Sequence, residues 1–158
     1  MLVRALGDDD RWWAEEELTR VWGATAVARL GELVDAAGCP GLVAMVADER
    51  AGLLTYVHRG DEVEVLTLHV SNQGTGVGRS LMDALWTEAQ EIGVGRIWLV
   101  TTNDNLRAID FYQRWGLDLS ELIHDGVAAS RGVKPGIPEV GPNGIPVRHE
   151  LVFERRVA

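Results

Sequence analysis

The chain has 158 residues, 46% of them hydrophobic, so it is long enough to form one domain with a hydrophobic core. Its 15 basic and 24 acidic side chains give a net charge of −9, which argues against binding to nucleic acid or anionic membranes and favours a cationic partner, although acidity also serves solubility alone. Cys39 is the only cysteine, which excludes an intramolecular disulfide or a thiolate zinc cluster and favours a cytoplasmic location.

The N-terminal quarter is predicted to contain a short strand and two helices. Leu2–Leu6 is apolar enough for an edge strand, and the aspartates after it leave no run typical of a signal peptide or membrane span. Asp10 is a candidate N-cap for a helix over Arg11–Trp22. In Ala24–Ala37 apolar residues recur at three-and-four spacing, which predicts a second helix that ends at Gly38.

Three antiparallel strands are expected next, followed by a crossover. The strands are compact apolar runs separated by short turns with charged residues and glycine, over Leu42–Ala47, Leu53–His58 and Val63–Val70. Gly76–Ile92 then has helical spacing, and Arg96–Thr102 returns to a strand pattern. A strand, a glycine-containing loop, a helix and a strand in this order predict a βαβ unit.

The last third is predicted to hold a helix over Asn105–Trp115 and strands over Leu117–His124 and Val147–Arg155. Between these strands, residues 125–146 contain four of the five prolines, which predicts a long structured loop or β-arm. Loops of this length are usually functional or disordered. Because the sequence has neither an internal repeat nor a linker, we expect a single α+β domain over residues 1–158.

A glycine-rich loop, Gln73–Arg79, separates the strand Val63–Val70 from the helix after it. Backbone amides and the helix dipole at such a place can bind phosphate oxygens, and glycine lets the backbone approach an anion. The loop does not fit the dinucleotide pattern GxGxxG, because Arg79 or Leu81 stands where the last glycine belongs, and it lacks the Gly-Lys-Ser/Thr of a Walker loop. By itself the loop is equally consistent with a tight turn from strand to helix.

A second motif follows about thirty residues later, where NLRAIDFYQRWGL begins at Asn105, just after a strand. Together the two motifs resemble the GCN5-related N-acetyltransferase (GNAT) family. The loop matches the family signature Gln/Arg-x-x-Gly-x-Gly/Ala at Gln73, Gly76 and Gly78. The second motif matches Asn-x-x-Ala-x-x-Phe/Leu-Tyr-x-x-x-Gly-Phe, with Leu117 in place of the final phenylalanine. The resemblance covers Glu62–Leu117 well and the flanks by element order.

The resemblance implies a fold and a reaction. The fold is a three-layer α/β arrangement within the α+β class, with a mixed, mostly antiparallel, twisted sheet of about seven strands, about four helices and a cofactor-binding core at about residues 62–117. The reaction is direct attack of a primary amine on acetyl-CoA in a ternary complex. The residues expected to contact the cofactor are Leu68, His69, Val70, Gln73, Gly74, Thr75, Gly76, Val77, Gly78, Arg79, Asn105, Ala108 and Tyr112.

The resemblance also implies roles in catalysis. Tyr112 matches the tyrosine that donates a proton to the departing thiolate, although an amphipathic core aromatic fits the same place. Glu64 lies near the position of the glutamate base of histone-type members, and a solvent-facing role stays open for it. His69 is the second candidate base, because imidazole titrates near neutrality. A backbone N–H near Val70 would bind the oxyanion. Asn105 is expected to bond the pantetheine arm or to cap its helix.

Metal binding is not expected, because no ligand-like spacing connects His58, His124 and His149.

The acceptor amine is least determined by the sequence. The family resemblance places the acceptor site between the first helices and the loop before the last strand, where Trp12, Glu15 and Glu16 form either a cation-attracting rim or a solvated helix face. A monomer and a homodimer both fit. The alternative function is a catalytically silent acyl-CoA sensor. A nucleotide-binding crossover domain is a third possibility, but the early hairpin strands argue against its parallel sheet.

Overall fold

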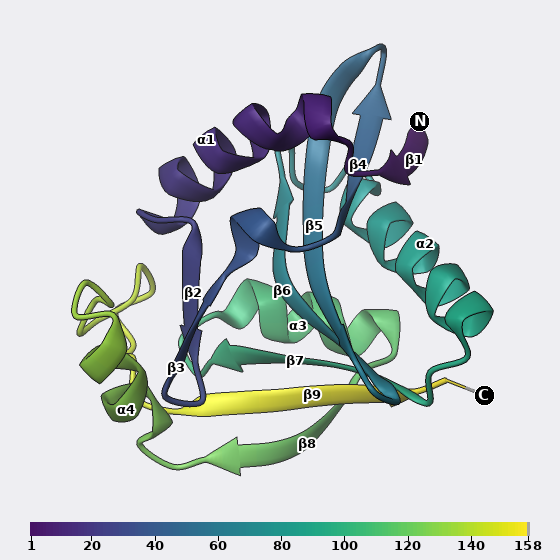
Figure 1. Cartoon of the computed structure of the whole chain (residues 1–158). Coiled ribbons are helices and arrows are strands. Elements are labelled where there is room, and N and C mark those ends of the chain that lie inside the picture. The colour runs from purple at the N-terminus through teal and green to yellow at the C-terminus, as the bar shows by residue number, and fades with distance from the viewer. Residues whose placement is uncertain (158) are drawn as a thin grey trace. The chain divides into compact units, whose positions relative to one another are not determined.

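The computed structural model describes residues 1–157 and shows four α-helices and nine strands among them (Figure 1). The elements in chain order are β1 (Leu2–Ala5), α1 (Arg11–Trp22), β2 (Ala26–Arg29), β3 (Glu32–Asp35), β4 (Gly41–Val46), β5 (Glu49–Arg59), β6 (Glu62–Val70), α2 (Val77–Ile92), β7 (Arg96–Thr102), α3 (Leu106–Trp115), β8 (Asp118–Ile123), α4 (Gly126–Val133) and β9 (Glu150–Arg156). Two short 3₁₀ turns are η1 (Asp8–Asp10) and η2 (Ala36–Gly38). Seven strands form a mixed sheet in the order β1-β4-β5-β6-β7-β9-β8, and β2 and β3 form a separate pair. The expected seven-stranded sheet with four helices is confirmed.

The chain separates into two compact units. Unit 1 comprises Met1–Val27, Asp35–Ile97 and the C-terminal residues from Arg156, whereas unit 2 comprises Ala28–Val34 and Trp98–Arg155. Unit 1 therefore holds β1, β4, β5, β6, α1 and α2, and unit 2 holds α3, α4, β8 and most of β7, β9 and the β2–β3 hairpin.

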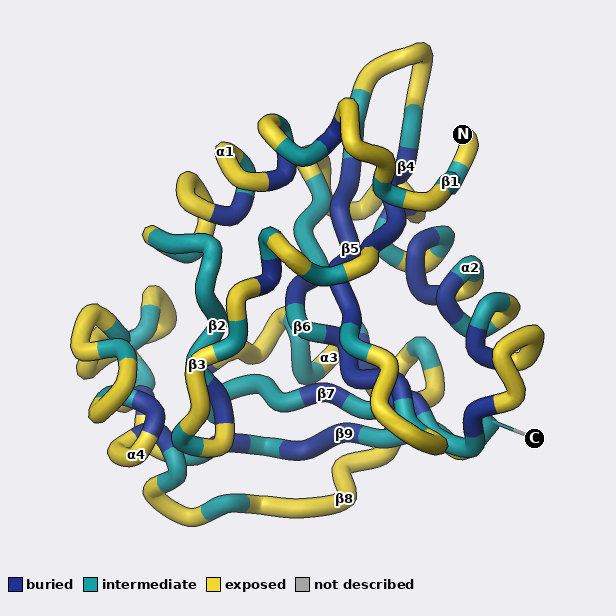
Figure 2. The backbone as a smooth tube through the Cα atoms, viewed as in Figure 1, coloured by how far each residue is buried: buried dark blue, intermediate teal, exposed yellow. Residues whose placement is uncertain are grey.

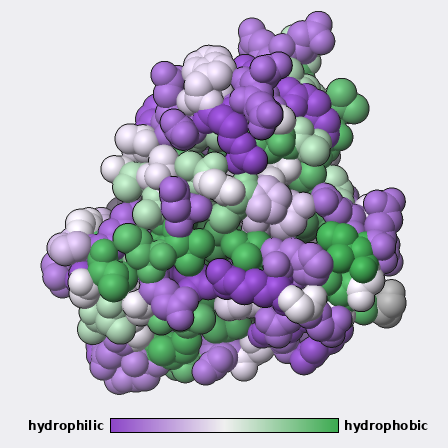
Figure 3. Space-filling model, viewed as in Figure 1, coloured by the Kyte–Doolittle hydropathy of each residue, from purple (hydrophilic) through white to green (hydrophobic). Residues whose placement is uncertain are grey.

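Four antiparallel strands form the scaffold of unit 1. Strand β4 pairs with β1 and β5, and β5 also pairs with β6. Ala47 and Asp48 have φ values of +51° and +63° in the β4–β5 turn, a two-residue turn whose twist suits a hairpin. The tip of this hairpin is hydrophilic, at the top of Figure 3. Each of the predicted strands in this part of the chain is confirmed, with shifted ends.

Helices α1 and α2 cover opposite faces of these strands. Ala14 and Leu18 of α1 pack in one core cluster with Leu53 of β5. Figure 2 shows buried stretches along both α1 and β5. The neighbouring residue, Gly52, meets α2 instead, because a Cβ there would lie 2.8 Å from the Val77 Cγ1 atom. Successive residues of a strand point to opposite faces, so α1 packs on the Leu53 face and α2 on the Gly52 face.

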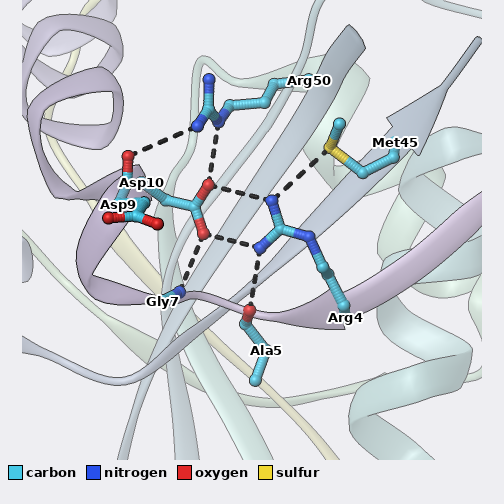
Figure 4. A network of polar contacts seen from close by, with 7 residues as sticks. All are labelled: Arg4, Ala5, Gly7, Asp9, Asp10, Met45 and Arg50. Atoms are coloured by element: carbon cyan, nitrogen blue, oxygen red, sulfur yellow. Dashed lines mark hydrogen bonds and ion pairs between the residues drawn. The ribbon is translucent and has the colours of Figure 1, made fainter. Parts of the chain in front are cut away.

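A network of ion pairs fixes the start of α1 (Figure 4). The buried Asp10 carboxylate accepts hydrogen bonds from Arg4 at 2.6 and 3.0 Å, from Arg50 at 2.9 Å and from the Gly7 N–H at 2.8 Å. The Arg4 hydrogen bonds, with those of Gly7 and Arg50, hold the pKa of Asp10 well below its usual range. Asp10 stands at the N-cap position of α1, as predicted, but its side chain makes no cap hydrogen bond to the helix. The polar hollow beside this network includes no residue of the glycine-rich loop.

Unit 2 is organised around buried Glu150. Strands β8 and β9 pair antiparallel, and Glu150 begins β9, three residues later than predicted. The Glu150 carboxylate accepts hydrogen bonds from the Ser130 hydroxyl of α4 at 2.9 Å and from the Leu30 N–H at 3.2 Å. Burial raises the pKa of Glu150, and the bonds from Ser130 and Leu30 oppose this rise. One carboxylate thus joins the β2–β3 hairpin, α4 and β9.

Two predicted segments differ from the structure. The helix expected over Ala24–Ala37 is wrong, because these residues form the β2–β3 hairpin and η2. Leu30 and Gly31 have φ values of +53° and +73° in the turn, which no right-handed helix allows. The segment 125–146, expected as a loop or β-arm, begins with helix α4, and its prolines all follow that helix.

Candidate functional site

The glycine-rich loop connects β6 to α2 within unit 1. Ser71–Gly76 are all exposed. Gly74 and Gly76 have φ values of +77° and +82°, and a Cβ added to either would meet nothing within 4 Å. Glycine is therefore required by the left-handed backbone rather than by close packing.

Gly76 is the N-cap of α2 and supplies no side chain to its first turn. The first amides of a helix need partners from outside the helix, and an anion is the partner they favour. Thr75 donates its hydroxyl hydrogen bond to the Asn72 carbonyl at 2.8 Å, which holds the loop from within. Buried Val77 anchors the helix start, whereas the Arg79 side chain is 78% exposed and only 4.0 Å from Asp83. An exposed ion pair at that distance contributes little to the free energy of folding, so the Arg79 guanidinium remains available to an anion.

The end of β6 carries the strand residues expected at the site. Leu68, His69 and Val70 are half-buried and pair with Leu54, Leu53 and Gly52 of β5. Since His69 lies opposite Leu53, its side chain is on the face that α1 covers.

His69 contacts three side chains of α1. Its Nε2 atom lies 3.0 Å from the Glu17 carboxylate and 3.2 Å from the Arg20 guanidinium, and its ring meets Trp22 edge-on at 6.2 Å between centroids. Burial lowers the pKa of His69, the Glu17 charge raises it and Arg20 lowers it. The imidazole is thus held neutral near neutral pH, the form a base requires.

Glu64 occupies the same face of β6 in a more enclosed place. Thr55 pairs with Thr67, but the next residue, Tyr56, pairs with Val65, so Leu66 is an unpaired bulge residue of β6. Because of this bulge Glu64 lies opposite Val57, and its side chain is on the same face of the sheet as Leu53. Its side chain is 3% exposed and lies 3.7 Å from the Arg59 guanidinium, whereas the His69 side chain is 15% exposed. Glu64 is therefore not solvent-facing, and of the two candidate bases His69 is the more accessible.

The second motif lies on α3 in unit 2 and is described by itself. Asn105 is the N-cap of α3, because its side-chain oxygen accepts a hydrogen bond from the Ala108 N–H at 3.3 Å. Tyr112 is buried beside Phe111, and burial raises the pKa of its phenol, which therefore stays protonated at neutral pH. Within residues 1–157 the Tyr112 hydroxyl has no hydrogen-bond partner, so it remains free to donate.

The loop, the end of β6, Glu64 and His69 all belong to unit 1. Asn105, Ala108 and Tyr112 belong to unit 2. The contact of Glu17 with His69 was not predicted, since no local pattern links α1 to the end of β6.

A second group of side chains, which no sequence pattern predicted, lies at the junction of β8 and β9. Ile123 pairs with Glu150, so the residues just beyond them, His124 and His149, come together with ring centroids 4.8 Å apart. Asp125 lies with them, and their ligand atoms are within 4.8 Å of one another. However, His149 Nδ1 accepts a hydrogen bond from the Asp125 N–H, and Arg148 pairs with the Asp125 carboxylate. These groups are already engaged, so their proximity alone does not favour a metal site. Antiparallel pairing was the signal that could have located them.

In the described part of the chain, no helix has both the length and the apolar character needed to cross a bilayer.

Comparison with known proteins identifies the family. The model of the acetyltransferase (GNAT) family matches residues 8–117. The uncharacterized protein YdhI of Bacillus subtilis is 36% identical over 107 residues, which cover 68% of this chain and 67% of that protein. Streptothricin acetyltransferase of Streptomyces lavendulae is 36% identical over 72 residues, which cover 44% of this chain and 36% of the enzyme.

Solved structures agree with this match at the level of the fold. The acetyltransferase yncA of Salmonella typhimurium, a putative enzyme solved with acetyl-CoA, superimposes with a TM-score of 0.70 at 18% identity and covers 99% of this chain and 94% of its own. A Bacillus subtilis acetyltransferase in complex with CoA gives a TM-score of 0.69 at 17% identity, over 99% and 98% of the two chains. This chain belongs to the GNAT acetyltransferase family.

Proposed function

We propose that this protein is an N-acetyltransferase that transfers the acetyl group of acetyl-CoA to a primary amine. The observation that carries the proposal is the exposed loop before α2, whose two left-handed glycines precede a helix start without a side-chain cap. This geometry suits a pyrophosphate, and the family match makes that pyrophosphate the one of CoA. Structural neighbours were solved with CoA or acetyl-CoA bound, the two described above among them.

In this proposal the donor lies along unit 1. The amides of Gly74–Arg79 bind the pyrophosphate, and exposed Arg79 adds a positive charge. The pantetheine arm follows the backbone of Leu68–Val70, where an N–H near Val70 stabilises the oxyanion. Removal of one such donor elsewhere costs about 10²–10³ in rate. Asn105, Ala108 and Tyr112 are the proposed contacts from unit 2.

The proposed reaction is a single displacement. The amine nitrogen, after losing a proton, attacks the thioester carbonyl carbon, so that a C–N bond forms and the C–S bond breaks. The sulfur leaves with the electron pair of the broken bond as a thiolate. The new amide nitrogen releases its second proton, which ends on the thiolate, directly or through water, to give the free CoA thiol. Because the pKa of the Tyr112 phenol is raised, the hydroxyl stabilises the thiolate chiefly by donating a hydrogen bond.

Proton removal from the amine is assigned to the face of β6 that carries Glu64 and His69. A lysine-like amine has a pKa of about 10.4, so a base or water must take its proton before attack. His69 is the first candidate because its side chain is less enclosed than that of Glu64, which is paired with Arg59.

The proposed acceptor is a cationic primary amine, in keeping with the net charge of −9. Relatives bear the names streptothricin acetyltransferase, aminoglycoside 6'-N-acetyltransferase and ribosomal-protein-S18-alanine N-acetyltransferase. We also propose a cytoplasmic location, as expected from the single cysteine.

The test is calorimetric binding of acetyl-CoA, followed by a thiol-release assay with streptothricin, kanamycin, spermidine, lysine and a peptide with N-terminal alanine. We expect saturable binding and thiol release with at least one amine, with the acetylated product identified by mass spectrometry. Failure to bind acetyl-CoA would overturn the proposal. Binding without thiol release across the panel would favour the acyl-CoA sensor instead.

A further inference from the structure

One nitrogen of the Arg20 guanidinium is hydrogen-bonded to both a carboxylate and an imidazole. Its Nη2 atom lies 2.6 Å from Glu17 Oε2 and 3.2 Å from His69 Nε2, and these two acceptor atoms are 3.0 Å apart. A guanidinium can only donate hydrogen bonds, so Nε2 accepts one and the neutral His69 ring carries its hydrogen on Nδ1. Two acceptors therefore converge on one positively charged nitrogen.

The two acceptors are held in place, whereas the guanidinium is not. The side chains of Glu17 and His69 are 17% and 15% exposed, and that of Arg20 is 62% exposed. Glu17 adjoins Leu18, which packs in the core, and Trp22 meets the His69 ring edge-on. Within residues 1–157 Arg20 has no other polar partner. A long side chain held only by these contacts can move into water at a small cost.

The position of the Arg20 Nη2 atom suits an aliphatic primary ammonium group. Such a group is a compact cation with three N–H donors, so it can donate to Glu17 and to His69 Nε2 at once. Glu17 offers a negative charge, and Nε2 offers a lone pair that can also take a proton. A quaternary ammonium has the charge but no N–H, and a neutral amide has N–H but no charge. Neither of these satisfies both acceptors.

We propose that Glu17 and His69 Nε2 bind the ammonium group of the acceptor, and that Arg20 occupies this place in the free protein until the acceptor displaces it. This inference rests on the proposed acetyl transfer and names the side chains that hold the substrate amine.

The same contacts account for the proton transfers. The ammonium gives one proton to His69 Nε2, and the electron pair of that N–H bond becomes the lone pair of the amine. This pair attacks the thioester carbon, so that the C–N bond forms and the C–S bond breaks with its electrons on sulfur. The second proton of the nitrogen ends on the thiolate. Glu17 stabilises the imidazolium, which then returns its proton to water.

Glu17 and Arg20 are thereby given opposite effects on the acceptor. Glu17 binds the substrate cation, whereas Arg20 competes with it. If their ion pair served only to stabilise α1, removal of either partner would have the same effect, because each substitution breaks the same pair. The direction of the two effects therefore distinguishes a binding site from a structural contact.

The first experiment observes the site without requiring turnover. Long-range ¹H–¹⁵N correlation spectra of the full chain, recorded slightly above neutral pH, report the tautomer of each imidazole, with His69→Gln used to assign the signal. We expect the Nδ1–H tautomer in the free protein. Ethylammonium chloride should shift the His69 Nε2 signal saturably, and tetramethylammonium chloride, which has the charge but no N–H, should not.

The same titration is repeated on variants of both residues. The Kd of ethylammonium should rise by about 10-fold or more in Glu17→Gln and fall by about 2- to 5-fold in Arg20→Met. An Nε2–H tautomer in the free protein, or equal shifts with both cations, would overturn the inference even if the enzyme is active. If Glu17→Gln does not fold, a Kd that does not fall in Arg20→Met, a substitution at an exposed position, has the same meaning.

The second experiment measures the KM of the best amine of the panel by thiol release, with saturating acetyl-CoA. Glu17→Gln should raise this KM by about 10-fold or more, Arg20→Met should lower it by about 2- to 5-fold, and neither should change the KM of acetyl-CoA. Glu16→Gln and Arg114→Met make the same charge changes at exposed helix positions and should leave the amine KM unchanged. If Glu17→Gln and Arg20→Met change the amine KM in the same direction, the ammonium site is wrong while acetyl transfer stands. Absence of thiol release with every amine would instead overturn the proposed function, and this inference with it.

Discussion

Substitution of Gly76 by alanine separates the anion-binding role of the loop from its contribution to stability. The Gly76 backbone has a φ of +82°, and an added Cβ would meet nothing within 4 Å. Its cost to the fold is therefore left-handed strain alone, about 1–2 kcal/mol. In a chain of this length each 1 kcal/mol lowers the melting temperature by about 2–4 °C. We expect Gly76→Ala to lower it by roughly 2–8 °C.

The expected effect on acetyl-CoA is separate from this strain. The amides at the start of α2 have no side-chain cap, and the proposal assigns them to the pyrophosphate. A hydrogen bond to a charged group contributes about 1.5–3 kcal/mol, so misplacement of one amide should weaken binding by about 10- to 100-fold. Calorimetric titration with acetyl-CoA measures this loss directly.

Gly93 provides the matched control at the other end of the same helix. It has a φ of +86°, an added Cβ meets nothing within 4 Å, and it caps the C-terminus of α2. Gly93→Ala should destabilise the fold about as much as Gly76→Ala does, yet leave the affinity for acetyl-CoA unchanged. Equal affinities of the two variants would refute the assignment of the loop to the pyrophosphate, because strain would then account for every effect.

Three further substitutions test other parts of the structure. Asp10→Asn should lower the free energy of unfolding, measured in urea, by about 2–3 kcal/mol. Because the pKa of this carboxylate is lowered, the wild type should lose that stability as the pH falls below about 4, and Asp10→Asn should not show this loss. Asp9→Asn, which makes the same charge change nearby, should stay within about 0.5 kcal/mol of the wild type. Tyr112→Phe should lower kcat by roughly 10²-fold and leave the acetyl-CoA Kd unchanged, and equal rates would remove Tyr112 from the mechanism. Glu150 has a raised pKa, so its protonation favours the fold at acidic pH and this contribution declines as the pH rises from about 4.5 through the folded value. The urea midpoint of Glu150→Gln, measured between about pH 4 and 8, should not show that decline. If the midpoint falls with pH as steeply in Glu150→Gln as in the wild type, the assignment of the decline to Glu150 is wrong.

The sheet could be predicted because its signals are local. Strands β4 to β7 of the seven-stranded sheet are largely apolar segments bounded by turn residues. The loop before α2 is rich in glycine, and the segment after it has apolar residues at helical spacing. The β2–β3 hairpin has no such local signal. Its apolar residues repeat at helical spacing, and what fixes its turn is the bonding of Leu30 to Glu150 and of Gly31 to Ser130, residues far away along the chain. Gly31 was the one local hint of a turn.

The candidate site also has a part that local sequence signals predict and a part that only packing determines. Backbone amides and glycines make the proposed contacts with acetyl-CoA, so a short motif is enough to predict them. The environment of His69 depends on side chains of α1 that are 49 residues away in the case of Arg20, and the enclosure of Glu64 depends on strand pairing and a bulge. Such properties arise only when the elements pack, and no spacing within one segment predicts them.

The acidic residues at the start of the chain have both a local sequence signal and a role in the packing of the elements. In the sequence they argued against a signal peptide and offered Asp10 as a helix cap, yet the Asp10 side chain binds Arg4 of β1 and Arg50 of β5 and so fixes where α1 begins. A helix turns by about 100° per residue, so a shift of α1 by one position would carry Glu17 away from His69 and Leu18 out of the core. The anchor and the core packing of Ala14 and Leu18 therefore set the same rotation of the helix. That rotation gives Glu17, and not the exposed Glu16, the contact with His69.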